Sequence, residues 1–286
     1  MKTRLLSIAA AVTLSGCTTE NLSESWQLDR LRILAVQAEP AEPAPGELVS
    51  FSSLVYAPPG TDLEGVIWFA CLPESADEFG CTLDSSLLED LDPENPDISA
   101  LVEAGLIGFE PLLAPTWTAP PTALDGLSEI EAQEGVSALV NLTALPTDTE
   151  DDGDFELAYK RLPISVALTP NHNPVVSQLL VDGAELVDGT LTTTTGTTHT
   201  IEPTLTDDSI EEYTYTTTEG DQEARVEEPY FTWYAEAGTF DQTFSLYPFN
   251  DVDWTAPREP FEGTIAVTVR DRRGGMTWTS LRVVVE

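Results

Sequence analysis

Short runs in which hydrophobic and polar residues alternate occupy the chain after residue 26, separated by Gly, Pro, Asp and Asn. Alternation with period two places every second side chain on the same face of a strand. Turn signals recur roughly every eight to twelve residues, as in antiparallel sandwiches. No long stretch has the spacing of an amphipathic helix. The pattern predicts an all-β fold, and its clearest runs are Val136–Leu142, Ile265–Val269 and Leu281–Val285.

A four-residue motif occurs twice, as Trp117-Thr118-Ala119-Pro120 and as Trp254-Thr255-Ala256-Pro257. An aromatic strand precedes each copy and a hairpin follows it. This matched order predicts two tandem modules, 27–168 and 171–286, joined at 169–174. The equivalent aromatic strands are 66–69 and 230–234, and the equivalent hairpins are 135–166 and 263–285.

Segment 84–113 interrupts this repeat as an insertion in the first module. Asp97 is expected to cap a short helix over 98–104, with Gly105 after its end. The apolar residues of the segment need cover. They either fold back onto an open sheet edge of their own module or form an exposed patch for a partner. These residues are Leu101, Val102, Leu106, Ile107, Phe109, Leu112 and Leu113.

The modules resemble immunoglobulin-like sandwiches of bacterial surface lipoproteins, including the polycystic-kidney-disease and cadherin-like types. Trp68 and Trp233 match the buried Trp of the third strand. The sequence Val269-Arg270-Asp271, followed by Gly274-Gly275, resembles the turn before the last strand. The resemblance implies two tandem antiparallel β-sandwiches, the first with a partly helical insertion. Such a fold does not by itself specify a function.

The N-terminal residues have the features of an export signal. Lys2 and Arg4 precede an apolar stretch over 5–14, which is too short to span a bilayer. Leu14-Ser15-Gly16-Cys17 resembles the bacterial lipobox. This resemblance implies removal of 1–16, lipidation of Cys17 with palmitate-type acyl chains, and a lipidated tether over 17–26. The alternative is an ordinary secretory signal with a chance Cys.

The lipid anchor that this resemblance implies predicts a location in the cell envelope. Thr18 follows Cys17 where an inner-membrane retention signal would have Asp, which favours the outer membrane. Cys71 and Cys81 form an even pair in an oxidising compartment and predict a structural disulfide. A redox or metal pair is the alternative, but its usual spacing and further ligands are missing.

The net charge of the chain restricts the kinds of molecule that it is expected to bind. The 286 residues include 50 acidic and 12 basic ones, for a net charge of −38. This charge disfavours nucleic acid and anionic lipid surfaces. With 41% hydrophobic residues, the chain still has enough apolar surface for a folded core.

An acidic loop between two predicted strands is the one candidate metal site. Asp148, Glu150, Asp152 and Asp154 alternate as Ca²⁺ ligands do in an EF-hand loop. The position for the bidentate Glu holds Tyr159, so a solvated hairpin loop is the alternative. No other cofactor is predicted. Asn171-His172-Asn173-Pro174 at the module junction predicts a rigid turn with an exposed His172.

No catalytic residues are predicted, because the common nucleophile, zinc and phosphate-loop motifs are absent and no nucleophile is tied to His199. The hypothesis is a non-enzymatic envelope lipoprotein that acts as a spacer or binding module. Its partners would be the membrane, through the lipid, and an envelope protein or polysaccharide. The alternatives are a calcium-dependent adhesion or matrix component and an unrecognised hydrolase.

Overall fold

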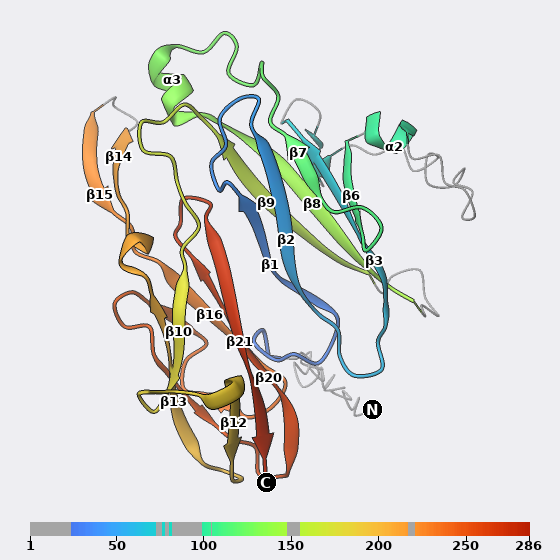
Figure 1. The fold of residues 1–286 in the computed structure, drawn as a ribbon, viewed down its shortest axis with the longest axis vertical. Coiled ribbons are helices and arrows are strands. Elements are labelled where there is room, and N and C mark those ends of the chain that lie inside the picture. The colour runs from blue at the N-terminus through green and yellow to red at the C-terminus, as the bar shows by residue number, and fades with distance from the viewer. Residues whose placement is uncertain are drawn as a thin grey trace, which may run out of the picture.

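The chain folds into two β-sandwiches, which meet near the middle of the molecule (Figure 1). The predicted all-β class is confirmed, and the strands pair antiparallel except β12 and β21. Within the described ranges, no helix combines the length and hydropathy needed to cross a membrane. The computed structural model describes residues 24–72, 76–77, 80–81, 99–103, 105–147, 155–216 and 221–286.

The first sandwich packs a three-stranded sheet, β1-β2-β7, against a four-stranded sheet, β6-β3-β8-β9. One hydrophobic cluster with Trp68, Val140 and Leu142 at its centre fills the space between them. The inward residues of β8 alternate along the strand, as predicted. The elements are β1 Arg32–Glu39, β2 Leu48–Tyr56, β3 Leu63–Cys71, β4 Ala76–Asp77, β5 Gly80–Cys81, α2 Ser99–Glu103, β6 Leu106–Glu110, β7 Thr116–Thr118, α3 Glu129–Glu134, β8 Val136–Pro146 and β9 Glu156–Ile164.

The second sandwich packs the sheet β11-β10-β13-β19-β17 against the sheet β12-β21-β20-β16-β18, with a separate hairpin β14-β15. Its core centres on Phe231, Trp233 and Trp254. The elements are β10 Val176–Val181, β11 Ala184–Glu185, η2 Val187–Gly189, β12 Thr190–Thr193, β13 Thr198–Leu205, η3 Asp207–Ser209, β14 Glu212–Thr216, β15 Gln222–Val226, β16 Tyr230–Ala235, β17 Thr239–Phe240, β18 Phe244–Leu246, β19 Val252–Thr255, β20 Phe261–Arg270 and β21 Met276–Val285.

Both sandwiches have the immunoglobulin strand order. The first, second and fifth main strands form one sheet (β1-β2-β7 or β10-β13-β19), and the third, sixth and seventh lie in the other (β3-β8-β9 or β16-β20-β21). The repeated motif occupies the same place in each. The backbone N–H of Ala119 donates to Glu47 O at 2.9 Å, and that of Ala256 donates to Thr197 O at 2.8 Å. The sequence repeat is therefore a structural repeat.

Trp68 and Trp233 are fully buried at equivalent positions on β3 and β16. A buried indole needs a partner for its N–H. Trp68 donates to Glu110 Oε2 at 2.9 Å, and Trp233 donates to Ser245 Oγ at 3.2 Å. Both acceptors lie on the neighbouring strand, β6 or β18, so each Trp ties its sheet together as well as filling the core.

Segment 84–113 is only partly an insertion. Its residues 106–110 form β6, which pairs with β3 and corresponds to β18 of the second sandwich. Leu101 of α2 and Leu106 are buried against Phe69, so this part covers a sheet edge of its own module. The helix spans Ser99–Glu103, inside the predicted range 98–104. The segment follows the repeat at β6 because β3 needs a partner on that edge.

Cys71 and Cys81 form the predicted disulfide, with their Cα atoms 5.6 Å apart. The bond joins the end of β3 to β5, beside the carbonyl of Leu139 on β8. The loop that it closes is short, with a sequence separation of 10. Chain entropy then gives a stabilisation of roughly 2.5–3 kcal/mol.

We predict that Trp233→Ala lowers the free energy of unfolding by about 3–5 kcal/mol, because it leaves a large cavity in the core and removes the hydrogen bond to Ser245. Chemical denaturation of the full chain measures the loss. Phe249→Ala is the control, because Phe249 is 76% exposed and its removal should change stability by no more than about 0.5 kcal/mol. Equal losses in the two variants would contradict the central role of Trp233.

Candidate functional site at the junction of the two sandwiches

The two sandwiches meet along β1 and the hairpin β20–β21, near the middle of the molecule (Figure 1). Hydrogen bonds cross this junction from several strands. Gln37 Nε2 donates to Met276 O at 2.6 Å, and Arg270 Nη2 donates to Leu34 O at 3.2 Å. Lys160 Nζ, from β9, donates to Gly274 O at 2.6 Å. The last turn of the second sandwich is thus held by both sheets of the first.

The linker between the sandwiches adds bonds to both. Asn173 Oδ1 accepts the N–H of Met276 at 2.9 Å, and its Nδ2 donates to Ala38 O at 2.7 Å. Asn171 Nδ2 donates to Asp271 Oδ2 at 2.9 Å. The His172 side chain is 69% exposed, as predicted, with Nδ1 2.6 Å from Glu211 Oε1. The linker is therefore fixed by side chains that bridge its two neighbours.

The turn between β20 and β21 is organised by Asp271. Its Oδ1 accepts the backbone N–H groups of Arg273, Gly274 and Gly275 at 2.7, 3.0 and 3.0 Å. Gly275 is required by space, since a Cβ there would lie 2.7 Å from the carbonyl oxygen of His172. Burial raises the pKa of Asp271 above its usual range. The turn suggested by the sequence resemblance is thus built around a buried carboxylate.

Arg273 holds three carboxylates around one guanidinium group. Its Nη1 lies 3.0 Å from both Glu211 Oε2 and Glu227 Oε1, and its Nη2 lies 3.5 Å from Glu42 Oε2. Glu42 comes from the first sandwich and the other two from the second. Burial, reinforced by the charge of Asp271, raises the pKa of Glu227 to about 7 despite the neighbouring Arg273. The cluster therefore links the two sandwiches and contains one carboxyl group, that of Glu227, whose pKa lies near neutral pH.

The segment before β1 also belongs to the junction. The backbone of Leu28 donates to Ala235 O at 2.9 Å, and Ala235 donates to Trp26 O at 3.1 Å. The Trp26 ring packs edge-on against Phe240, with the ring centroids 5.6 Å apart. Trp26, which we expected at the end of a tether, is instead docked on the second sandwich. Leu28 and Tyr234 share a small apolar cluster that includes Leu34 from β1.

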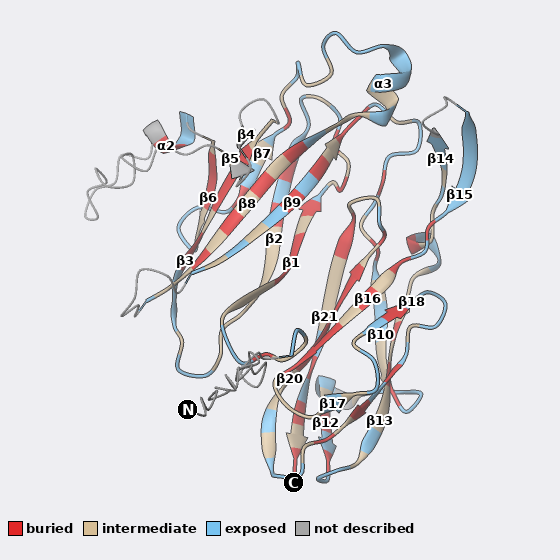
Figure 2. Cartoon of the chain, turned by 180° about the vertical axis from the view of Figure 1, so that it is seen from behind, coloured by how far each residue is buried: buried red, intermediate tan, exposed pale blue. Residues whose placement is uncertain are grey.

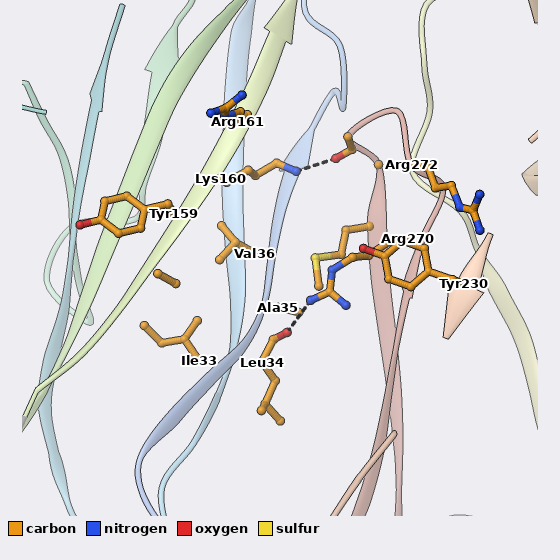
Figure 3. Close-up of a pocket in the computed structure, with 14 residues that line it drawn as sticks. Ile33, Leu34, Ala35, Val36, Tyr159, Lys160, Arg161, Tyr230, Arg270 and Arg272 are labelled. Carbon is orange, nitrogen blue, oxygen red and sulfur yellow. Dashed lines mark hydrogen bonds between the residues drawn. The ribbon is translucent and has the colours of Figure 1, made fainter. Parts of the chain in front are cut away.

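A cleft of about 300 Å³ opens at this junction, between β1, β9 and the β20–β21 turn (Figure 3). Its lining includes the apolar side chains of Ile33, Val36 and Met276. Four basic residues and none of the 50 acidic ones are among the residues described around it. The basic residues are Lys160, Arg161, Arg270 and Arg272. In so acidic a chain, this concentration of positive charge marks the cleft as the candidate binding site.

The basic side chains of the cleft differ in their hydrogen-bond and ion-pair partners and in their burial. The Arg270 guanidinium donates to Thr268 Oγ1 at 2.9 Å and to the Leu34 carbonyl, and the structure gives it no carboxylate partner among the described residues. Arg272 lies 3.7 Å from the exposed carboxylate of Glu228. Burial lowers the pKa of Lys160 to about 8, because the charged form loses hydration there. Figure 3 shows Lys160 and Arg270 reaching across the junction from opposite sandwiches.

The other predicted site residues lie elsewhere. Cys17 and the calcium candidates Asp148, Glu150, Asp152 and Asp154 fall outside the described residues. Within the part that the structure describes, no group of three His, Cys, Asp or Glu residues is placed to hold a metal ion. Sequence reasoning missed Glu42, Lys160 and the Arg cluster of the last turn. The signal that would have found them is the run Arg270-Asp271-Arg272-Arg273 in a chain with few basic residues.

His199 has two side-chain partners that the sequence did not indicate. Its Nε2 lies 2.7 Å from Thr193 Oγ1 and its Nδ1 lies 2.7 Å from Asp182 Oδ2. A hydroxyl, an imidazole and a carboxylate in this order resemble a hydrolytic triad. Thr193 is buried, however. None of these three residues lines the cleft at the junction. Asp182 also accepts the N–H of Thr200 at 3.0 Å, so the arrangement secures the β10–β11 turn against β13.

Comparisons with known proteins find no matching family model and no matching curated protein. Among solved structures, the chain is similar to the two tandem V-type regions of VCBP3, a v-region-containing chitin binding protein. The two share 14% sequence identity and a TM-score of 0.31, and the match covers 89% of this chain and 99% of that chain. Fibronectin(III)-like modules of Clostridium thermocellum CbhA match with 10% identity, a TM-score of 0.25, and coverage of 88% and 94%.

A third match is to three N-terminal domains of the Hoc capsid protein of bacteriophage RB49, with 10% identity and a TM-score of 0.21. It covers 90% of this chain and 59% of that chain, so our chain spans less than two thirds of the Hoc fragment. These scores are too low to transfer the role of any residue. The immunoglobulin-like arrangement rests on the strand order of the chain itself.

We predict that the junction makes stability depend on pH through Glu227. The folded state keeps the proton of Glu227 up to a pKa of about 7, whereas the ordinary pKa of a Glu side chain is about 4.5. The folded state therefore binds more protons between these values, and stability falls as pH rises through them. Glu227→Gln should remove about 1–3 kcal/mol of this fall. Denaturant unfolding at several values between pH 4.5 and 7 measures the slope.

Glu228→Gln is the matched control for this measurement. Glu228 is adjacent in sequence and carries the same charge, but its side chain is 73% exposed and lies outside the buried cluster around Arg273. The control should keep the wild-type slope. If both variants flatten the slope equally, general charge repulsion rather than the buried cluster determines the pH dependence.

Proposed function

We propose that the chain is a non-enzymatic lipoprotein of the cell envelope, in which the two sandwiches act as one rigid spacer and binding module. The observation that carries this proposal is the junction, where the linker and the last turn bond to both sandwiches. Interfaces between domains of one chain usually allow relative motion unless they are extensive. Here the contacts include a cluster of charged side chains, an apolar cluster and backbone hydrogen bonds. Such a junction keeps the orientation of the two modules fixed.

The docking of Trp26 determines how an anchor on Cys17 would hold the molecule. The chain from Cys17 to Glu24 spans at most about 25 Å when it is fully extended. Because Trp26 and Leu28 contact the second sandwich, the anchor would lead into the side of that sandwich near β16 and β17. Both sandwiches would then lie close to the membrane that holds the lipid. The net charge of −38 keeps the protein surface from adhering to anionic head groups.

The arrangement of Thr193, His199 and Asp182 gives no support to a hydrolase. A nucleophilic hydroxyl must reach a substrate, and Thr193, the last residue of β12, is buried. The binding role is supported by the basic cleft at the junction, which would be built only when the two sandwiches are held together. Spacer and binding functions thus depend on the same contacts.

We predict that Cys17→Ser moves the protein from the membrane fraction to the soluble fraction or leaves it unprocessed. The lipid would be attached to the Cys17 thiol, and Ser cannot form the thioether. Cell fractionation and metabolic labelling with a palmitate analogue measure the two effects. Thr18→Ala is the control and should remain labelled and in the membrane fraction. Labelling of the Cys17→Ser variant would contradict lipidation at this residue.

We predict that Asn173→Ala loosens the junction without unfolding either sandwich, because it removes bonds to Met276 and Ala38. Spin labels at Glu129→Cys and Glu259→Cys, in a Cys17→Ser background, report the distance between the sandwiches. The native disulfide leaves no other free thiol among the 3 cysteines. The spin-labelled protein with Asn173 intact should give one narrow distance distribution. The Asn173→Ala variant should give a broader one.

Gln242→Ala is the control for the distance measurement. Gln242 also donates an amide hydrogen bond to a backbone carbonyl, that of Asp251, but both residues belong to the second sandwich. Its removal should leave the distribution narrow. A broad distribution in the protein without the Asn173 substitution would overturn the rigid spacer.

A further inference from the structure

An exposed apolar surface lies on β18 and the loop that follows it, at the edge of the second sandwich. Its large side chains are those of Phe244, Leu246, Tyr247 and Phe249, all of them exposed. Single exposed apolar residues are common on proteins, but several in one short segment form a patch of the kind that marks interaction sites. We call these four residues the aromatic patch, together with Tyr230, whose ring centroid lies 5.4 Å from that of Phe244.

Backbone hydrogen bonds hold the patch in place. The N–H of Tyr247 donates to Pro229 O at 2.9 Å. The N–H of Phe249 donates to Leu246 O at 2.7 Å, which closes a tight turn. A surface that enters lipid must pair its backbone polar groups within the protein, because lipid offers them no partner. These two bonds meet that requirement for N–H groups at the exposed end of the patch.

The patch and the N-terminal segment share one edge of β16, whose other edge is occupied by β20. On the shared edge, β18 lies beside the start of β16 and pairs Phe244 with Thr232 (Figure 2). Gln27 pairs with Ala235, three residues further along the same strand. At about 3.3 Å per residue, the two contacts are roughly 10 Å apart. The chain that leads back to Cys17 therefore starts beside the patch.

The patch is uncharged in a chain whose net charge is −38. Residues 242–250 contain no acidic or basic side chain, and Asp241 and Asp251 flank them. An uncharged surface of aromatic and aliphatic side chains suits the interface of a lipid bilayer, where Tyr rings are enriched. The flanking carboxylates disfavour anionic head groups. The chemistry of the patch thus fits a lipid surface of neutral head groups.

We propose that the aromatic patch inserts into the interface of the membrane that holds the lipid anchor and forms a second contact beside the tether. This inference rests on the proposed lipidation of Cys17. A tether that spans at most about 25 Å from Cys17 to Glu24 keeps the patch within reach of the bilayer. Apolar surfaces of this kind enter the boundary between head groups and acyl chains by about 5–10 Å. A second contact would fix the orientation of the two sandwiches toward the membrane.

The proposal is tested with a spin label at Phe249→Cys in the full lipidated chain, reconstituted in phosphatidylcholine vesicles. Lipid occupies the Cys17 thiol and the disulfide occupies the other two of the 3 cysteines, so the introduced thiol alone is labelled. Molecular oxygen concentrates in the bilayer and a neutral nickel chelate stays in water. The ratio of the relaxation that they cause therefore reports where the label lies.

A label at Ile130→Cys is the matched control. Ile130 is also apolar and is 58% exposed, but it lies on α3, at the end of the first sandwich away from the N-terminal segment (Figure 1). We expect the oxygen-to-nickel ratio to be several-fold higher at Phe249→Cys than at Ile130→Cys. Vesicles that contain phosphatidylglycerol should lower the ratio at Phe249→Cys, because the carboxylates that flank the patch repel anionic head groups.

The variant Leu246→Glu tests the patch itself. It places a charge in the patch and should lower the ratio at the Phe249→Cys label several-fold, because a carboxylate resists entry into lipid. Ile130→Glu adds the same charge on α3 and should leave the ratio unchanged. Equal effects of the two variants would show that the charge of the whole chain, rather than the patch, controls the contact, and would overturn the proposal.

The remaining outcomes separate this proposal from that of a lipid-anchored spacer. If the protein sediments with the vesicles but the Phe249→Cys label is relaxed mainly by the nickel chelate, the patch lies in water. That result overturns the insertion and leaves the anchored spacer standing. Weak relaxation by both reagents would show a patch covered by protein, such as a second copy, and would also overturn it. Protein that does not sediment with the vesicles would remove the anchor and the insertion together.

Discussion

The buried turn around Asp271 is the constraint on which the arrangement of the two sandwiches depends. Its carboxylate accepts three backbone N–H groups and so fixes where Arg273 and Gly274 lie. Arg273 then reaches Glu42 of the first sandwich, and the Gly274 carbonyl receives Lys160. A buried carboxylate is costly unless hydrogen bonds satisfy it. The three hydrogen bonds offset that cost. The turn also contacts the first sandwich through the Gly274 carbonyl.

The same turn separates two uses of basic residues in a very acidic chain. Arg273 is enclosed by carboxylates and serves the junction, whereas Arg270 and Arg272 lie at the cleft and face neutral groups or an exposed acid. Figure 2 shows the contrast in burial between the strands that meet at the junction and the exposed hairpin β14–β15. A structural cluster and a candidate binding site are thus adjacent.

The two sandwiches share the same core arrangement but differ at their edges. Trp68 and Trp233 fill equivalent cores and bond to equivalent strands. The differences lie at the edges. The first sandwich carries α2 and the disulfide beside β3, whereas the second carries the parallel pair β12–β21 and the hairpin β14–β15. Function is therefore sought at these edges and at the junction rather than in the shared cores.

The sequence by itself determined the all-β class, the repeat, the two central Trp residues and the disulfide, because each depends on local periodicity or on residues close together in the chain. It missed β6 as a strand, since a short run such as Leu106–Glu110 becomes a strand only through pairing with β3. Only the tertiary structure decided the junction, the docking of Trp26 and the cleft. Lys160 and Gly274 are separated by 114 residues, and no pattern along the chain shows that they meet.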